Sequence, residues 1–224
     1  MTSARLADVI EGASCLLVDF DGPICSVFSE FSPAAVAQEL RTRLAVPGMP
    51  ETNEPFDVLS YVAEHHPSAA ERAENELARL ESVAVRGAEP TPAADSVLRR
   101  FGETSTPLVV VSNNSARCVH EYLARHELAQ YVSAVSSRTA SDPRLLKPHP
   151  HLLHKAAELA GRDVSHCVMI GDSATDIEAA QAVGAATVGY ANKPGKRELF
   201  ARLGADVIID DMAALLSIHA ARTD

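Results

Sequence analysis

The feature that most constrains the fold is a regular alternation between short apolar segments, rich in β-branched residues, and amphipathic helical patterns. Strands that are apolar on both faces and are separated by helices are typical of a parallel sheet covered on both sides. The sequence therefore predicts an α/β fold. The predicted strands cover residues 14–20, 107–112, 131–136, 166–170, 185–190 and 206–209, and the predicted helices lie near 116–126, 149–160, 174–183, 196–203 and 211–220.

One long stretch, residues 24–95, breaks this alternation because it contains helical patterns and no predicted strand. Segments rich in Pro and Gly divide it and lead the chain back to the alternating region. We therefore predict an all-helical domain at 24–95, inserted into an α/β domain formed by 1–23 and 96–224. Its three predicted helices cover residues 32–44, 54–66 and 68–85.

The charge balance bears on possible partners. The chain has 224 residues, 46% of them hydrophobic, and a formal net charge of -10. A strongly negative chain argues against a nucleic-acid binder, which normally presents a basic face. No apolar run is long enough to span a bilayer, so no membrane partner is expected. A negatively charged substrate would need local positive charge or a metal ion. The sequence gives no indication of the oligomeric state.

The four cysteines are Cys15, Cys25, Cys118 and Cys167, and they show no CxxC spacing. Two of them fall in predicted buried strands, where a reduced thiol packs as a small apolar side chain. The first fourteen residues lack the continuous apolar core of a signal peptide. Together these observations predict a cytoplasmic protein.

Polar residues follow the predicted strands at their carboxyl ends. Asp19 and Asp21 end the first strand, Ser112 ends the second, and Asp172 follows the strand at 166–170. Ligands of open α/β sheets bind beyond the carboxyl ends of the strands, so these side chains are expected to converge. Two acids at the end of a buried strand repel each other unless positive charge lies nearby. The alternative for the first pair is an ordinary surface turn, because Asp-Gly is a common turn pair.

Four segments, "DFDGP", "VVVSNNS", "LLKPHP" and "MIGDSATD", occur in this order at the ends of the expected elements. Together they resemble the four motifs of the haloacid dehalogenase superfamily, in particular its phosphatases with a helical cap. The resemblance covers essentially the whole chain. It implies a Rossmann-like core with an inserted helical cap domain and a Mg²⁺-dependent phosphatase acting on a small phosphorylated metabolite.

The resemblance assigns roles to the acids. It implies that Asp19 is the nucleophile, which forms an aspartyl-phosphate. It implies that Asp21 is the general acid that protonates the leaving oxygen and then the base that activates water. The Asp19 carboxylate, the Asp21 main-chain carbonyl and Asp172 would hold Mg²⁺, a hard cation that takes oxygen ligands.

By the same resemblance, Ser112 and the Asn113 amide bind the transferring phosphoryl group, and Lys147 neutralises phosphoryl oxygens and the nucleophile. Each has a simpler alternative. Asn113, Asn114 or Ser115 would serve as the N-cap of the following helix. A lysine before a proline is commonly a solvated loop residue.

Asp176 has two interpretations that are compatible with each other. It either supports the metal site from a second layer, or it forms a capping box with Ser173 at the start of a helix. Three further side chains, His149, His151 and His154, lie close together in sequence. No acid or cysteine accompanies them, so a zinc site is not favoured.

One position departs from the family pattern. The residue after "DxDG" is usually Thr or Val, and here it is Pro23. Proline lacks an N–H and fixes its φ angle, so the turn that carries Asp21 is expected to be stiffer. The departure affects the placement of the acid–base group and, through it, turnover and substrate range.

Other functions of the same scaffold remain open from the sequence. They are a phosphosugar mutase, a phosphonate hydrolase, a dehalogenase, or a phosphate-binding module without catalysis. A phosphonate hydrolase typically uses a cap lysine, and residues 24–95 contain none. A dehalogenase needs neither Asp21 nor a metal. A receiver domain resembles the set of acids, but its paired acids and its phosphorylated aspartate lie on different strands.

Overall fold

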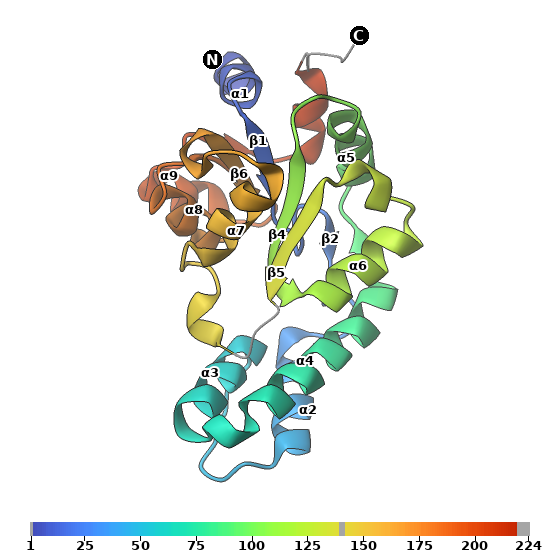
Figure 1. Cartoon of the computed structure of the whole chain (residues 1–224), viewed down its shortest axis with the longest axis vertical. Helices are drawn as coiled ribbons and strands as arrows, with labels where there is room; N and C mark the ends of the chain where they lie inside the picture. The colour runs from blue at the N-terminus through green and yellow to red at the C-terminus, as the bar shows by residue number, and fades with distance from the viewer. Residues whose placement is uncertain (1, 139–141, 219–224) are drawn as a thin grey trace.

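The protein is described by a computed structural model that covers residues 2–138 and 142–218. Its core is a parallel sheet, which confirms the predicted α/β class (Figure 1). Every strand of this sheet overlaps a segment that the sequence predicts as a strand. In spatial order the strands are β5 (Ala134–Arg138), β4 (Leu108–Ser115), β1 (Cys15–Val18), β6 (Cys167–Gly171), β7 (Ala186–Tyr190) and β8 (Val207–Ile209).

The central strand β1 shows why both faces of the sheet are covered. Leu16 and Val18 belong to one apolar layer, and Cys15 and Leu17 belong to the other, because successive side chains of a strand point to opposite faces. The first layer packs against α1 (Thr2–Glu11), α5 (Ala94–Gly102), α6 (Ala116–Arg125) and the 3₁₀ helix η6 (Met212–Ser217). The second packs against α7 (His151–Ala160) and α8 (Ala174–Gln181).

The helices of the core differ from the prediction in three places. Helix α9 (Lys196–Leu203) agrees with it, whereas α1 and α5 were not predicted. The segment predicted as a helix at 211–220 is the 3₁₀ helix η6, and residues 219–220 lie outside the described part of the chain. Helix α5 carries a recognisable signal, because its buried residues Ala94, Val97, Leu98 and Phe101 recur at helical spacing.

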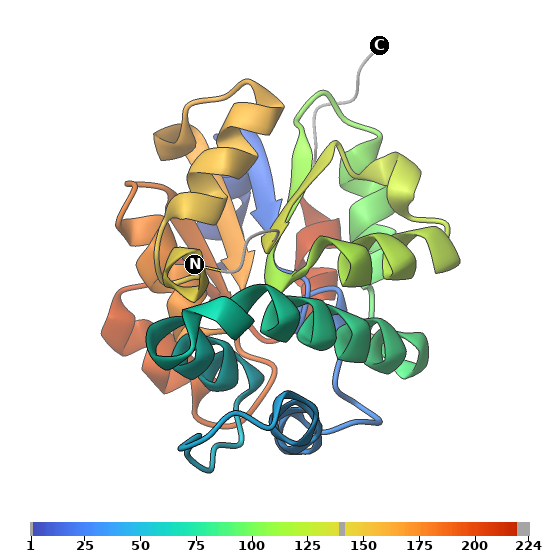
Figure 2. The same cartoon turned by 60° about the horizontal axis from the view of Figure 1, so that its bottom comes forward.

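The inserted segment forms three helices at the end of the molecule toward which the strands of the sheet point (Figures 1 and 2). They are α2 (Pro33–Leu44), α3 (Pro55–His65) and α4 (Ala70–Ala84). Helix α2 begins as its sequence indicates, with Ser32 accepting the N–H of Ala35 at the N-cap and Pro33 in the first turn. The three helices share an apolar cluster that is separate from the two layers of the sheet.

The expectation that residues 24–95 contain no strand is wrong. Two short strands, β2 (Cys25–Ser26) and β3 (Glu89–Pro90), pair antiparallel where the chain leaves the core and where it returns. Strands of two residues are too short to produce a hydrophobic period, so no sequence pattern announces them. The pairing brings the two connecting segments side by side and fixes the exit of the chain next to Asp21.

Helix α4 belongs to both parts of the molecule. Its first half contributes Ala73 and Leu77 to the apolar cluster of the inserted helices. Its last turn contributes Ala84 to the layer on the sheet. In Figure 2 this helix crosses in front of the ends of the strands. Because α4 packs in both apolar clusters, it holds the inserted helices in a defined position relative to the sheet.

None of the described helices is both long enough and apolar enough to cross a bilayer.

Candidate active site

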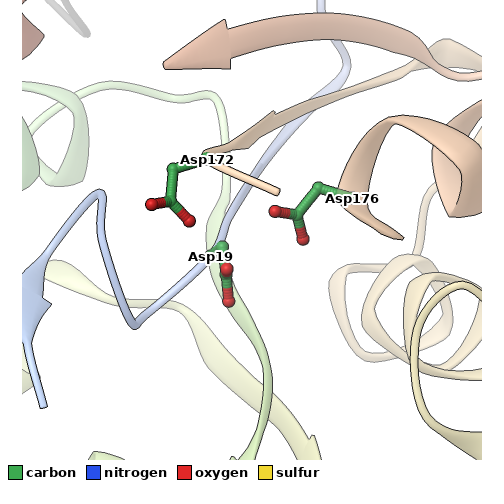
Figure 3. A group of neighbouring side chains, drawn as sticks. All are labelled: Asp19, Asp172 and Asp176. Carbon is green, nitrogen blue, oxygen red and sulfur yellow. The ribbon is translucent and has the colours of Figure 1, made fainter. Parts of the chain in front are cut away.

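The two central strands bring Asp19 and Asp172 to the same edge of the sheet. Strands β1 and β6 are paired in register, with Val18 opposite Ile170, and each aspartate follows its strand. Asp176, in the first turn of α8, completes the group (Figure 3). Among the described residues, these three side chains form a candidate metal centre, because each offers a carboxylate oxygen and these atoms lie within 4.8 Å of one another.

Two glycines allow this close approach. A Cβ at Gly22 would lie 2.3 Å from the carboxyl carbon of Asp172, and the φ of Gly22 is +113°. A Cβ at Gly171 would lie 2.3 Å from the carboxyl carbon of Asp176. A side chain at either position would push one acid away from the others. The glycines that follow or precede the aspartates in the sequence are therefore part of the site.

Lys147 lies beneath the aspartates and is buried. Its Nζ donates to Asp176 Oδ1 at 2.6 Å, to Asp19 Oδ1 at 2.8 Å and to the Val111 carbonyl at 3.1 Å. Burial on its own would lower the pKa of Lys147, but Asp176 and Asp19 outweigh it and raise the pKa. The side chain is thus a fixed ammonium ion and not a solvated loop lysine.

The Asp19 carboxylate has one engaged oxygen and one open oxygen. Oδ1 accepts from Lys147 and from the Phe20 N–H at 2.7 Å. No donor within the described part of the chain reaches Oδ2. Burial and the neighbouring Asp176 raise the pKa of Asp19, and Lys147 offsets this only in part. The Asp19 carboxylate is therefore held in a fixed orientation, but its negative charge is only partly compensated by Lys147.

Asp172 is held by two residues that sequence reasoning missed. Its Oδ2 accepts from Asn192 Nδ2 at 3.0 Å and from Lys196 Nζ at 2.5 Å. Both donors come from the loop and the first turn that follow β7. A signal for them exists, because "NKPGK" directly follows a predicted strand whose carboxyl end meets the same edge of the sheet.

Asp176 forms the capping box that the sequence predicted, and it also binds Lys147. Its Oδ2 accepts from the Ser173 N–H at 3.0 Å and from Ser173 Oγ at 2.6 Å, which completes a capping box for α8. Its Oδ1 is bound to Lys147. The side chain is fully buried, so the helix cap fixes the carboxylate that in turn fixes the lysine.

Asp21 is half-buried and is not one of the three acids of the candidate metal centre. Its Oδ1 accepts from the Val27 N–H at 2.9 Å. Burial raises the pKa of Asp21 to about 6, and the Val27 N–H lowers it in part. A carboxyl group with a pKa near neutrality exchanges a proton readily. Thr91, on the returning segment, donates to the Gly22 carbonyl at 2.5 Å and so stabilises the turn that contains Pro23.

The last residues of β4, which extends to Ser115, include the two that are predicted to bind the phosphoryl group. Ser112 is buried, and its Oγ accepts from the Asn114 N–H at 3.1 Å and donates to Asn114 Oδ1 at 3.2 Å. The Asn113 side chain holds the backbone of Lys147, with Oδ1 accepting its N–H at 2.9 Å and Nδ2 donating to its carbonyl at 3.2 Å. The N-cap of α6 is Ser115.

A buried ion network supports this segment, and sequence reasoning did not identify it. Glu81 of α4 accepts from both terminal nitrogens of Arg138, at 2.9 Å each, from the Ser115 N–H at 2.9 Å and from Asn114 Nδ2 at 3.2 Å. Arg138 also binds Glu74 at 2.7 Å. Burial would lower the pKa of Arg138, but the two glutamates raise it overall. The network ties α4 to the residues next to Ser112.

The residues predicted from the sequence to act on the substrate border one cleft with a volume of about 830 Å³. Asp19, Asp21, Ser112, Lys147 and Asp172 line it from the sheet. The opposite wall is formed by the first half of α3, through Glu54, Phe56, Asp57 and Ser60. The cleft can therefore hold a small molecule with one end against the aspartates and the other against the inserted helices.

Known proteins resemble this chain in sequence and in fold. The sequence profile of the haloacid dehalogenase-like hydrolases matches residues 14–184. The plasmid phosphoglycolate phosphatase of Cupriavidus necator is 31% identical over 219 residues, which cover 93% of this chain and 84% of that protein. The phosphoglycolate phosphatase of Neisseria meningitidis is 36% identical over 100 residues, which cover 45% of this chain and only 42% of that relative.

The fold is similar to that of solved structures. The crystal structure of CbbY from Rhodobacter sphaeroides in complex with phosphate superimposes with a TM-score of 0.69 and 16% sequence identity, covering 90% of this chain and 95% of that one. At this identity the likeness concerns the fold alone. The family profile covers most of this chain, and the Cupriavidus relative is matched along most of its length. The chain therefore belongs to the haloacid dehalogenase-like hydrolases, as its four motifs predict.

Proposed function

We propose that the protein is a phosphatase that hydrolyses a small phosphorylated metabolite through an aspartyl-phosphate intermediate on Asp19. The observation that carries this proposal is the state of the Asp19 carboxylate. One oxygen is fixed by Lys147 and the Phe20 N–H, the other has no donor among the described residues, and Asp19 borders the cleft. A carboxylate oriented in this way is suited to nucleophilic attack on phosphorus.

In the first step, Asp19 Oδ2 attacks phosphorus and the bond from phosphorus to the ester oxygen breaks. Asp21 donates its proton to the leaving oxygen, which departs as an alcohol. In the second step, water attacks the phosphorus and gives a proton to Asp21, the bond from phosphorus to Asp19 Oδ2 breaks, and inorganic phosphate leaves with Asp19 restored as a carboxylate. Lys147 compensates negative charge at Asp19 throughout, and the Ser112 hydroxyl and the Asn113 N–H bind phosphoryl oxygens.

A divalent cation, Mg²⁺ by its preference for oxygen ligands, fits the group formed by Asp19, Asp172 and Asp176. Three carboxylates with oxygens this close together repel one another, and the pKa of Asp19 is raised by its burial and, in addition, by the charges of Asp176 and Asp172. In the mechanism we assign the ion to Asp19, the Asp21 carbonyl and Asp172. When bound, it neutralises charge on the phosphoryl group and on the acids.

Residues 24–95 are proposed to act as a cap on the core formed by 1–23 and 96–224. Their helix α3 supplies the wall of the cleft that faces the aspartates. A wall of this kind excludes water and contacts the leaving group. The cysteines of the described chain are free and buried, which agrees with a protein of the reducing cytoplasm.

The direct experiment replaces the nucleophile. Asp19→Asn is expected to abolish turnover of an aryl phosphate ester with Mg²⁺, while circular dichroism shows a folded protein. The matched control is Asp8→Asn on the exposed face of α1, which is expected to keep full activity. Mass spectrometry after acid quenching should find the phosphoryl adduct on Asp19 in the wild type. Full activity of Asp19→Asn would disprove the proposed nucleophile.

A further inference from the structure

The wall of the cleft that faces the leaving group is acidic. Of the residues that the inserted helices contribute, Glu54 and Asp57 carry carboxylates, Ser60 carries a hydroxyl, and Phe56 provides a ring. The acids are exposed, as expected for groups that meet solvent or a ligand. One oxygen of Asp57 accepts from Thr52 Oγ1 at 2.7 Å, which orients the carboxylate without neutralising it.

No basic group of the inserted segment faces this wall. Residues 24–95 contain five arginines, two histidines and no lysine. Arg41 lines a different hollow, between α2 and the following loop. The others are engaged elsewhere: Arg43 with Glu39 and Glu76, Arg79 with Glu76, Arg86 with Glu121, Arg72 with the Leu44 carbonyl, His65 with the Tyr61 carbonyl and His66 with the Pro47 carbonyl.

The N-terminus of α3 borders the cleft but is poorly suited to hold an anion. Helix N-termini attract anions through free backbone N–H groups. Here the first helical residue is Pro55, which has no N–H, and the N–H of Asp57 is bound to the Glu54 carbonyl at 3.1 Å. The carboxylates of Glu54 and Asp57 stand at the same end, so they already occupy the favourable potential of the helix dipole.

Three of the described residues that line the cleft on the core side carry basic side chains, and two of them, Lys147 and Arg144, are paired with carboxylates. Lys147 is bound to Asp19 and Asp176. The Nδ1 of His149 accepts the His151 N–H at 3.2 Å, so this nitrogen is engaged within the chain. Arg144 is 88% exposed and makes two bonds of 2.8 Å with Asp142.

The buried Arg138 lies behind this wall, with its guanidinium carbon 5.4 Å from the centre of the Phe56 ring. It is shielded from the cleft by that ring and is bound to Glu74 and Glu81. Its charge is therefore already balanced on the far side of the ring from a ligand.

We infer that the leaving group of the substrate carries no negative charge, and that it presents hydroxyl or ammonium groups to Glu54, Asp57 and Ser60. This inference rests on the proposed phosphatase function and refines it. A carboxylate or a second phosphate on the leaving group would face two carboxylates, while Lys147 and Arg144, which line the same cleft, are already paired with acids, and this arrangement is unfavourable. The substrate class is a phosphoric monoester of a polyol or an amino alcohol.

Three small esters of similar length test the charge directly. They are phosphoethanolamine, ethylene glycol monophosphate and 2-phosphoglycolate, whose leaving groups end in an ammonium, a hydroxyl and a carboxylate. The expected kcat/KM with Mg²⁺ is lowest for 2-phosphoglycolate, by about tenfold relative to the hydroxyl ester. Because the acids are exposed, the difference should narrow to about threefold or less in roughly 1 M salt.

Variants identify the groups responsible. Glu54→Gln combined with Asp57→Asn is expected to bring kcat/KM for 2-phosphoglycolate to within about threefold of that for the hydroxyl ester. The Asn side chain keeps a carbonyl oxygen for Thr52, so the start of α3 is preserved. The matched control is Glu51→Gln, an exposed acid of the same connecting segment that lines the other hollow. It should leave the tenfold ratio unchanged.

The outcomes separate the inference from the function on which it rests. Turnover of an aryl phosphate ester together with a preference for 2-phosphoglycolate would overturn the inference alone. If that preference disappears in Arg144→Gln, carboxylate recognition belongs to Arg144. The inference is also overturned if the double variant keeps the wild-type ratio of kcat/KM between the hydroxyl ester and 2-phosphoglycolate. Absence of turnover with all esters, the aryl ester included, would overturn the phosphatase function itself.

Discussion

Two buried groups of charges lie close to each other in this molecule and are built in opposite ways. At the junction of α4 and the sheet, each carboxylate oxygen of Glu81 accepts two hydrogen bonds, one from Arg138 and one from a neutral N–H group. In the cleft, Asp19 and Asp172 each have one oxygen with two donors and one oxygen with none among the described residues.

The difference distinguishes structure from function. A buried carboxylate whose oxygens are all satisfied holds two elements together and has no reason to bind anything else. A pair of carboxylates with an open oxygen each, close to a third acid, is incomplete without a cation or a reacting group. The first arrangement predicts that a mutation lowers the free energy of unfolding and that added metal does not change it. The second predicts that added metal raises the free energy of unfolding.

The largest effect is expected at the satisfied group. Glu81→Gln places an amide NH₂ among donors, which removes two hydrogen bonds and leaves Arg138 poorly paired in a buried site. The free energy of unfolding should fall by about 3 kcal/mol, as for other broken buried ion pairs. Urea denaturation measures this change.

The matched control lies on the same helix. Glu76 pairs with Arg79 at 3.2 Å, and its side chain is 30% exposed. Glu76→Gln should cost about 0.5 kcal/mol or less, because exposed ion pairs contribute little. Equal losses in the two variants would show that the Glu81 network is no more important than a surface pair.

A smaller effect, with the opposite sign, is expected at the incomplete group. Mg²⁺ at 100 times its dissociation constant should stabilise the wild type by about 2.7 kcal/mol, because the folded state alone gathers the ligands. Thermal unfolding with Mg²⁺ and with a chelator measures this. Asp172→Asn should lose most of the stabilisation, whereas Glu81→Gln should retain it. Stabilisation of Asp172→Asn equal to that of the wild type would exclude Asp172 as a ligand.

The sequence predicted the incomplete group much better than the satisfied one, and the reason is physical. Asp19 and Asp172 each follow an apolar strand, so the parallel sheet alone brings them to one edge. Glu81 lies on an amphipathic helix, where most charged residues are solvated, and its partner Arg138 is far away in sequence. Nothing local in either segment encodes their meeting, which depends on how α4 packs across the sheet.

The same contrast applies to the secondary structure. The strands of the sheet were predicted because each is long enough to display an apolar pattern. The pair β2 and β3 was missed because two residues carry no period, although it fixes the turn beside Asp21. The contacts of Lys196 and Asn192 with Asp172 were not predicted, although both residues follow a strand whose carboxyl end meets the same edge of the sheet.

The smallest effect is expected at Pro23, the position that departs from the family pattern. The bonds that hold this turn do not involve Pro23: the Gly22 N–H donates to the Cys25 carbonyl at 2.7 Å, Thr91 donates to the Gly22 carbonyl, and the Val27 N–H binds Asp21. Pro23→Thr should therefore change kcat for an aryl phosphate ester by less than about tenfold, a barrier change below about 1.4 kcal/mol.

The same substitution should lower the free energy of unfolding by about 0.4–1 kcal/mol, because proline restricts the unfolded chain. Pro50→Thr, in the exposed connector of the inserted segment, is the control for this general effect and should leave kcat unchanged. A change in kcat well beyond tenfold at Pro23 alone would mean that the proline itself positions Asp21. The acid–base group would then depend on the rigidity of its turn more than on the hydrogen bonds that surround it.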